Sequence, residues 1–258
     1  PVHIAVYDRI LGPEHITTEI IQGPPAQAIA GYPSNSDVEE LARILHEAKR
    51  PMIYVGDGVN KSGGEKLLGM LANHFGANVA SMWGDLRGVS AAHTLHCGYF
   101  RAPVVELEPD AIIAVGVRHG GNGTSADFKI FESAKTIAAV GPDVEIFENI
   151  PGLDLAVMAD ESRTLERLLE LANSQYESNA YDDRRAAALK NASRLRHDRR
   201  SALQSPTEIS GQVRPLALLD AVDGALEDRG GGIITTEQFA VPLEDVNEKP
   251  DGGNNTYI

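Results

Sequence analysis

Cysteine and positive charge are both scarce in this sequence. Cys97 is the single cysteine among 258 residues, so the chain cannot form an internal disulfide, and we expect a protein of the reducing cytoplasm. Lysine and arginine together number 23, against 37 aspartate and glutamate residues. The resulting formal net charge of -14 disfavours nucleic acids and anionic membranes as partners. No apolar run approaches the roughly 20 residues that a membrane-spanning helix needs.

Several signatures of catalysis and cofactor binding are missing as well. The sequence contains no nucleophile elbow and no Ser-His-Asp set. The spaced carboxylates of a glycosidase do not stand out. The three spaced glycines of the full dinucleotide fingerprint are absent too, so a glycine turn in this chain is a weak signal when taken alone.

The sequence does contain a repeated pattern, in which a short apolar run ends in a turn that carries glycine or aspartate. The clearest example is Met52 to Val55, followed by Gly56-Asp57-Gly58. Comparable runs cover residues 78–82, 111–115, 135–140 and 155–158. Helical patterns at 38–48, 64–75 and 162–172 lie between most of them. This alternation predicts an α/β fold with a doubly wound parallel sheet.

Helix starts follow from capping residues. Ser36 or Asp37 is expected to cap the helix at residues 38–48. Ser62 is expected to cap the helix after the first glycine turn, with Glu65 three residues on completing a capping box.

Ligands of open parallel sheets bind beyond the carboxyl ends of the strands. Gly56, Gly116, Asp143 and Asp160 each follow a predicted strand, so we expect them along one edge of the sheet. The glycines of the Gly56-Asp57-Gly58 turn would let the backbone approach a phosphate closely, and amides at the next helix start would favour it. A turn made only for packing is an equally good interpretation.

Three charged residues at this edge have two interpretations each. Arg118 could hold a phosphate with its guanidinium, or form a salt bridge at the sheet edge. Asp143 and Asp160 could accept hydrogen bonds from ribose hydroxyls or an adenine amino group, or cap helices. The ligand that these residues would bind together is a small-molecule nucleotide.

Two further features suggest functions for which a plain alternative is favoured. His93, His96 and Cys97 place three metal-ligand types within five residues, but no distant partner set accompanies them, so an ordinary loop is expected. Residues 182–203 form a basic helical pattern. Because the whole chain is acidic, a solvated or interface helix is preferred over a nucleic-acid-binding one.

The order of these segments resembles the central domain of the thiamine-diphosphate-dependent decarboxylase and carboligase family, which includes acetolactate synthase. The similar segments are 48–58, 93–98, 109–118 and 159–162, within residues 36–171. The resemblance implies 2-oxo acid substrates, thiamine diphosphate and Mg²⁺ in the parent enzyme, and a homodimer or homotetramer. In flavin-binding members a second arginine follows the one that matches Arg118. This chain continues with His119 and glycines, so of the two candidate ligands ADP is expected to bind better than FAD.

The resemblance also divides the chain. Residues 1–35 would be the end of an amino-terminal pyrimidine-binding domain and a linker, 36–175 a central nucleotide-binding-like domain, 176–213 a linker helix, and 214–258 the start of a carboxy-terminal diphosphate-binding domain. Gln238 would lie near the phosphates of thiamine diphosphate.

The family's activating glutamate would precede Pro1, and its metal motif would follow Ile258. No residue of this chain is therefore assigned as catalytic or as a metal ligand, and the chain alone is not expected to catalyse. The alternative is a stand-alone adenine-nucleotide-binding module without thiamine chemistry.

Overall fold

The computed structural model describes residues 31–82, 88–89, 93–99, 104, 106–117 and 131–204, and further on 218, 221–222, 224–226, 228–234 and 256–257. Arg118 and Gln238 lie outside the described residues. None of the helices in these ranges is both long enough and apolar enough to cross a membrane.

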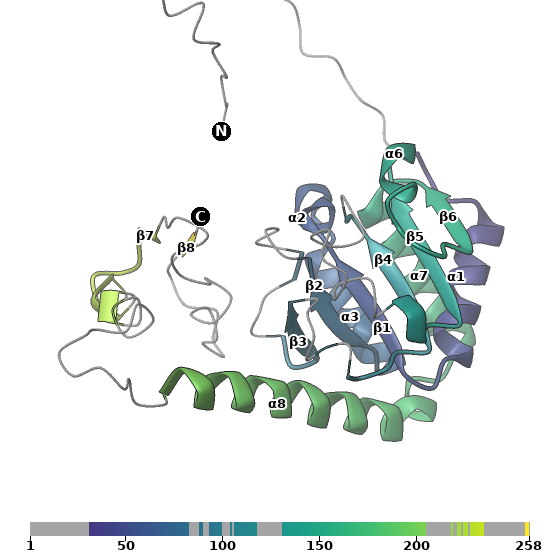
Figure 1. Ribbon diagram of the computed structural model, residues 1–258. Coiled ribbons are helices and arrows are strands. Elements are labelled where there is room, and N and C mark those ends of the chain that lie inside the picture. The colour runs from purple at the N-terminus through teal and green to yellow at the C-terminus, as the bar shows by residue number, and fades with distance from the viewer. Residues whose placement is uncertain are drawn as a thin grey trace, which may run out of the picture.

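Six strands form one sheet in the order β3-β2-β1-β4-β5-β6, and every neighbouring pair runs parallel (Figure 1). The strands are β1 (Pro51–Val55), β2 (Asn78–Ser81), β3 (His96–Tyr99), β4 (Ala111–Val115), β5 (Thr136–Gly141) and β6 (Leu155–Met158). The prediction of a doubly wound parallel sheet is confirmed, since the order reverses between β1 and β4 as that fold requires. Separately, β7 (Ile233–Ile234) pairs in parallel with β8 (Thr256–Tyr257).

Helices cover the large sheet on both faces. They are α1 (Asn35–Glu47), α2 (Asp57–Ser62), α3 (Glu65–Phe75), α6 (Val144–Phe147), α7 (Glu161–Gln175), the 3₁₀ helix η2 (Ser178–Tyr181) and α8 (Asp182–Gln204). Along β1, Ile53 and Val55 join the apolar cluster of α1, α3 and α7, whereas Met52 and Tyr54 join a second cluster that includes residues of α8. Because side chains alternate along a strand, both faces of the sheet are buried.

Helix α1 begins at Asn35, before either of the two residues that were expected to cap it. Ser34, and not Ser36 or Asp37, is the N-cap, and its hydroxyl accepts a hydrogen bond from the amide of Asp37 at 3.1 Å. The Asp37 carboxylate accepts the amide of Ser34 at 3.1 Å in return. Asp37 therefore serves as the reciprocal member of a capping box.

The predicted capping box at Ser62 and Glu65 is wrong. Ser62 is the last residue of α2, and its hydroxyl donates to the carbonyl of Val59 at 3.1 Å. Gly63 then ends α2 in the left-handed region at φ 78°, and α3 starts after Gly64. The physical reason is the glycine pair: a left-handed residue after Ser62 stops one helix before the next can start.

The loop predicted around His96 and Cys97 is also wrong, because these residues form the edge strand β3. The ring Nε2 of His96 lies 2.8 Å from the hydroxyl of Ser81 on β2, and both side chains are buried. No group of three or more histidine, cysteine, aspartate or glutamate residues in the described part of the chain is arranged to hold a metal ion.

The first turn of α8 is anchored by two arginines that donate to the last carbonyls of other helices. Arg184 donates to Phe75 at the end of α3 at 2.6 Å and to Ala48 at the end of α1. Arg185 donates to the carbonyl of Asn73 at 2.6 Å. Cations suit helix carboxyl ends, where carbonyls lack partners. This part of the basic helix is therefore an interface, which agrees with the preferred interpretation.

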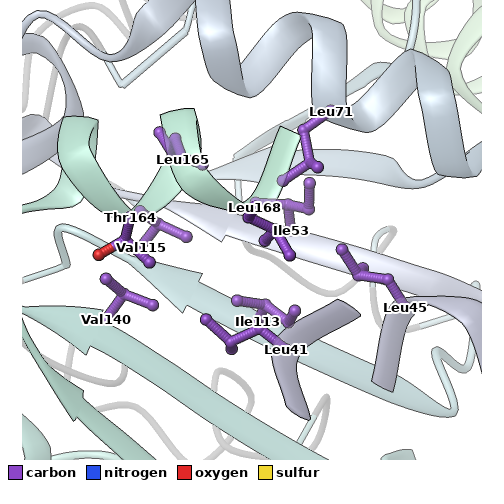
Figure 2. A pocket seen from close by; sticks show the side chains of 10 residues that line it. All are labelled: Leu41, Leu45, Ile53, Leu71, Ile113, Val115, Val140, Thr164, Leu165 and Leu168. Carbon is purple, nitrogen blue, oxygen red and sulfur yellow. The ribbon is translucent and has the colours of Figure 1, made fainter. Parts of the chain in front are cut away.

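A small cavity of about 10 Å³ lies in the core between the sheet and α1, α3 and α7 (Figure 2). Nine aliphatic side chains and Thr164 line it. The Thr164 hydroxyl already donates its hydrogen bond to the carbonyl of Asp160 at 2.8 Å, so it cannot donate to a ligand in the cavity. An apolar space of this size is a packing defect, and a ligand site is to be sought at the sheet edge.

Candidate functional site at the carboxyl edge of the sheet

The predicted site residues within the described part of the chain follow the carboxyl ends of four adjacent parallel strands (Figure 1). Gly56 follows β1, Gly116 follows β4, Asp143 follows β5 and Asp160 follows β6. The expectation that these positions lie along one edge is confirmed. Gly56 and Gly116 flank the point where the strand order reverses, which is where doubly wound sheets bind their ligands.

The turns after β1 and β4 are bonded to each other. The amide of Gly56 donates to the carbonyl of Val115 at 3.0 Å, and the amide of Gly58 donates to the carbonyl of Gly116 at 3.0 Å. Gly116 has φ 62°, a left-handed conformation that glycine adopts without strain. These bonds consume two of the amides that a phosphate at this turn would use.

Contact between the two turns requires glycine on both sides. A Cβ added at Gly56 would lie 2.3 Å from the carbonyl oxygen of Gly116. One added at Gly58 would lie 2.7 Å from Gly116 Cα, and one added at Gly116 would lie 2.6 Å from the amide nitrogen of Val59. The packing interpretation therefore accounts for all three glycines. Their role in binding a cofactor, and that of Asp57, stay predictions.

Asp143 and Asp160 are both helix caps. The Asp143 carboxylate accepts the amide of Glu145 at 3.0 Å at the start of α6. The Asp160 carboxylate accepts the amide of Arg163 at 2.9 Å at the start of α7. Capping fits both positions, as the sequence allowed. A contact with ribose or adenine stays a prediction for the remaining lone pairs.

Glu161, the first residue of α7, is a buried acid that the sequence did not single out. Only 4% of it is exposed, and its carboxylate Oε1 would lie 2.4 Å from a Cβ placed on Gly58. Burial raises the pKa of Glu161, and the nearby carboxylates of Asp160 and Asp57 raise it further. Its own backbone amide and Lys61 act in the opposite direction.

No sequence signal distinguished Glu161 from an ordinary acid in the first turn of a helix. Lys61 forms its ion pair with Asp57 and not with Glu161: its Nζ lies 2.5 Å from the Asp57 carboxylate. The edge thus brings three carboxylates together with one lysine among the described residues, in a place where a phosphate would need positive charge.

The described residues at this edge do not fit the phosphates of ADP or FAD. The amides of Gly56 and Gly58 already have carbonyl partners, and the side chains beside them are acidic. Arg118, the predicted phosphate ligand, and Gln238, the predicted neighbour of thiamine diphosphate, lie outside the described residues. Their roles stay predictions.

The strand order and the glycine turns at its reversal point define a doubly wound α/β domain. Residues 38–168, half of the chain, match the family model of the thiamine pyrophosphate enzyme central domain. The matched residues span the sheet from α1 to α7. The chain belongs to the thiamine pyrophosphate enzyme family through this domain, and the suspected family resemblance is confirmed.

Curated relatives include large subunits of acetolactate synthase. That of Corynebacterium glutamicum is 28% identical over 158 residues, which cover 57% of this chain and 25% of the relative. That of Lactococcus lactis subsp. lactis is 26% identical over 144 residues, covering 54% of this chain and 25% of the relative. The matches thus span about a quarter of the length of these relatives.

The fold has solved counterparts as well. Benzoylformate decarboxylase from Polynucleobacter necessarius superposes with a TM-score of 0.61 at 17% sequence identity. The match covers 93% of this chain and 43% of that protein. At this identity the likeness establishes the fold alone.

Proposed function

We propose that this chain supplies the central domain of a thiamine-diphosphate-dependent enzyme that decarboxylates or joins 2-oxo acids, in the manner of acetolactate synthase. The match of residues 38–168 to the central-domain model carries the proposal. The acetolactate synthase relatives, whose matches cover 57% and 54% of this chain, support 2-oxo acids as the substrate class.

In such an enzyme the bound thiamine diphosphate supplies the nucleophile and the electron sink. The role of this chain is to position flanking domains. Two observations support that role. Gly31, from the segment before α1, accepts the amide of Asp160 at 2.9 Å, which ties the entering chain to the sheet edge. Arg184 and Arg185 tie the departing helix α8 to the ends of α1 and α3.

Binding of the cofactor tests the proposal. The full-length gene product should bind thiamine diphosphate in calorimetry, and removal of Mg²⁺ with a chelator should weaken that binding. Residues 1–258 alone should bind it poorly, because the family resemblance assigns none of them as a metal ligand. If residues 1–258 alone bound thiamine diphosphate as tightly as the full-length protein, the proposed role of this chain as the central domain would be contradicted.

Magnesium, a cytoplasmic location and assembly into a homodimer or homotetramer belong to the same proposal. Cys97, the single cysteine, supports a reducing compartment. Light scattering of the purified protein measures the assembly state directly, and a monomer at micromolar concentration would contradict the proposed oligomer.

The alternative, a stand-alone adenine-nucleotide-binding module, makes a different prediction. Such a module would bind ADP without any response to thiamine diphosphate. None of the contacts made by the described residues favours it over the enzyme domain.

A further inference from the structure

We propose that the reversal point of the sheet is closed to nucleotide phosphates by the chain's own groups, with the Glu161 side chain filling the space beside Gly58. The inference concerns the central sheet alone and does not depend on thiamine chemistry in the rest of the protein. It rests on the hydrogen-bond partners of two segments, on packing at the glycine turns and on local charge.

The amino-terminal end of α7 is the first segment. Helix starts carry unpaired amides and a partial positive charge, which together make an anion site. Here Asp160 donates its amide to Gly31 at 2.9 Å, and Arg163 donates to the Asp160 carboxylate at 2.9 Å. Two of the four amides that open this helix thus already have partners within the protein.

The turn after β1 is the second segment. A phosphate-binding glycine turn holds its ligand with backbone amides that point outward. In this chain the amides of Gly56 and Gly58 point to carbonyls of the β4 turn, at 3.0 Å each. The side of Gly58 on which a Cβ would stand faces Glu161 Oε1 and Gly116. The space that glycine leaves is therefore filled by the protein.

Charge points to the same conclusion. Glu161 is buried with Asp57 and Asp160 as neighbours, and Lys61 bonds to Asp57 at 2.5 Å. A diphosphate brought to this edge would meet carboxylates in a poorly solvated setting, where like charges repel more strongly than in water. The carboxylates at this edge thus disfavour a ligand anion.

Titration of the unaltered protein decides the matter. ADP, FAD and sodium pyrophosphate are added separately, near neutral pH and up to about 1 mM, a concentration at which even weak sites fill appreciably. We expect no saturable heat, and no shift in the amide resonances of Gly56, Gly58 and Glu161. Saturable binding of any of the three ligands that shifts these resonances would overturn the proposal.

A pair of variants tests the charge of Glu161 independently. Glu161→Gln removes a buried acid, whereas Glu166→Gln removes an exposed acid of the same helix that lies 3.6 Å from Arg163. Near neutral pH, E161Q should raise the melting temperature and E166Q should leave it nearly unchanged. A lower melting temperature for E161Q would mean that a cation such as Arg118 pairs with Glu161, and the edge would then be equipped for an anion. If E161Q does not fold, the titration still decides.

Discussion

Replacing Gly58 with alanine adds one methyl group where the β1 turn meets the β4 turn. The new Cβ would lie 2.7 Å from Gly116 Cα, 2.9 Å from the Gly116 carbonyl oxygen and 2.4 Å from Glu161 Oε1. A glutamate side chain can move aside, but the two Gly116 atoms belong to the backbone, and the carbonyl oxygen accepts the hydrogen bond from the Gly58 amide. The substitution therefore forces the strands' carboxyl ends apart.

Overpacking of this kind typically costs about 1–3 kcal/mol, and rigid backbone neighbours place Gly58→Ala near 3 kcal/mol. In a domain of this size each 1 kcal/mol lowers Tm by roughly 2–4 °C, so Tm should fall by about 6–12 °C. Gly141→Ala is the matched control, because Gly141 ends β5 at the same edge. Among the described residues its added Cβ would contact only Ile146, at 3.6 Å. That change should cost less than about 1 kcal/mol.

Urea and thermal unfolding followed by circular dichroism measure both variants against the unaltered protein. The slope of free energy against urea should stay unchanged if only the native state is strained. If Gly58→Ala proved no more costly than Gly141→Ala, the close approach of the two turns would be refuted, and with it the packing explanation for these glycines.

Two further predictions concern charge. The pKa of Glu161 is raised in the folded state, so its contribution to folding is fully present below the ordinary glutamate pKa of about 4.3 and is lost as pH rises through the raised value. Glu161→Gln should therefore raise Tm near pH 7, with the gain vanishing toward pH 4, and a gain independent of pH would contradict the cause given. Arg184→Ala should lower the free energy of unfolding in urea by about 2–3 kcal/mol, because it removes charge-assisted bonds to the carbonyls of Phe75 and Ala48 and the stacking on the Tyr181 ring. Arg194→Ala breaks only an exposed ion pair with Asp198 at 3.4 Å, so it should lower that free energy by about 0.5 kcal/mol or less. Equal costs for the two arginine variants would show that Arg184 does not anchor α8.

The sheet was predictable because five of its strands are short apolar runs with glycine or aspartate at their ends. β4, for instance, is Ala111–Val115 in both the sequence pattern and the structure. β3 escaped notice because its sequence, His-Cys-Gly-Tyr, has no apolar run. A parallel edge strand of this kind is fixed by its pairing with β2, which a pattern within the chain does not reveal.

The candidate site was predictable in its place but not in its contacts. Parallel strands bring their carboxyl ends together, so the positions of Gly56 and Gly116 along one edge follow from topology. Their mutual contact joins residues far apart in the sequence, and no local signal announces it. Glu161 was missed for a related reason, since its burial depends on where the β1 turn lies.

We propose that this chain belongs to an enzyme that acts on 2-oxo acids through thiamine diphosphate. Carbon dioxide release from pyruvate, measured with the gene's complete product in the presence of Mg²⁺, tests it most directly. We expect release that requires added thiamine diphosphate. Absence of release from pyruvate, 2-oxobutyrate and benzoylformate alike, by a folded protein saturated with the cofactor, would contradict it.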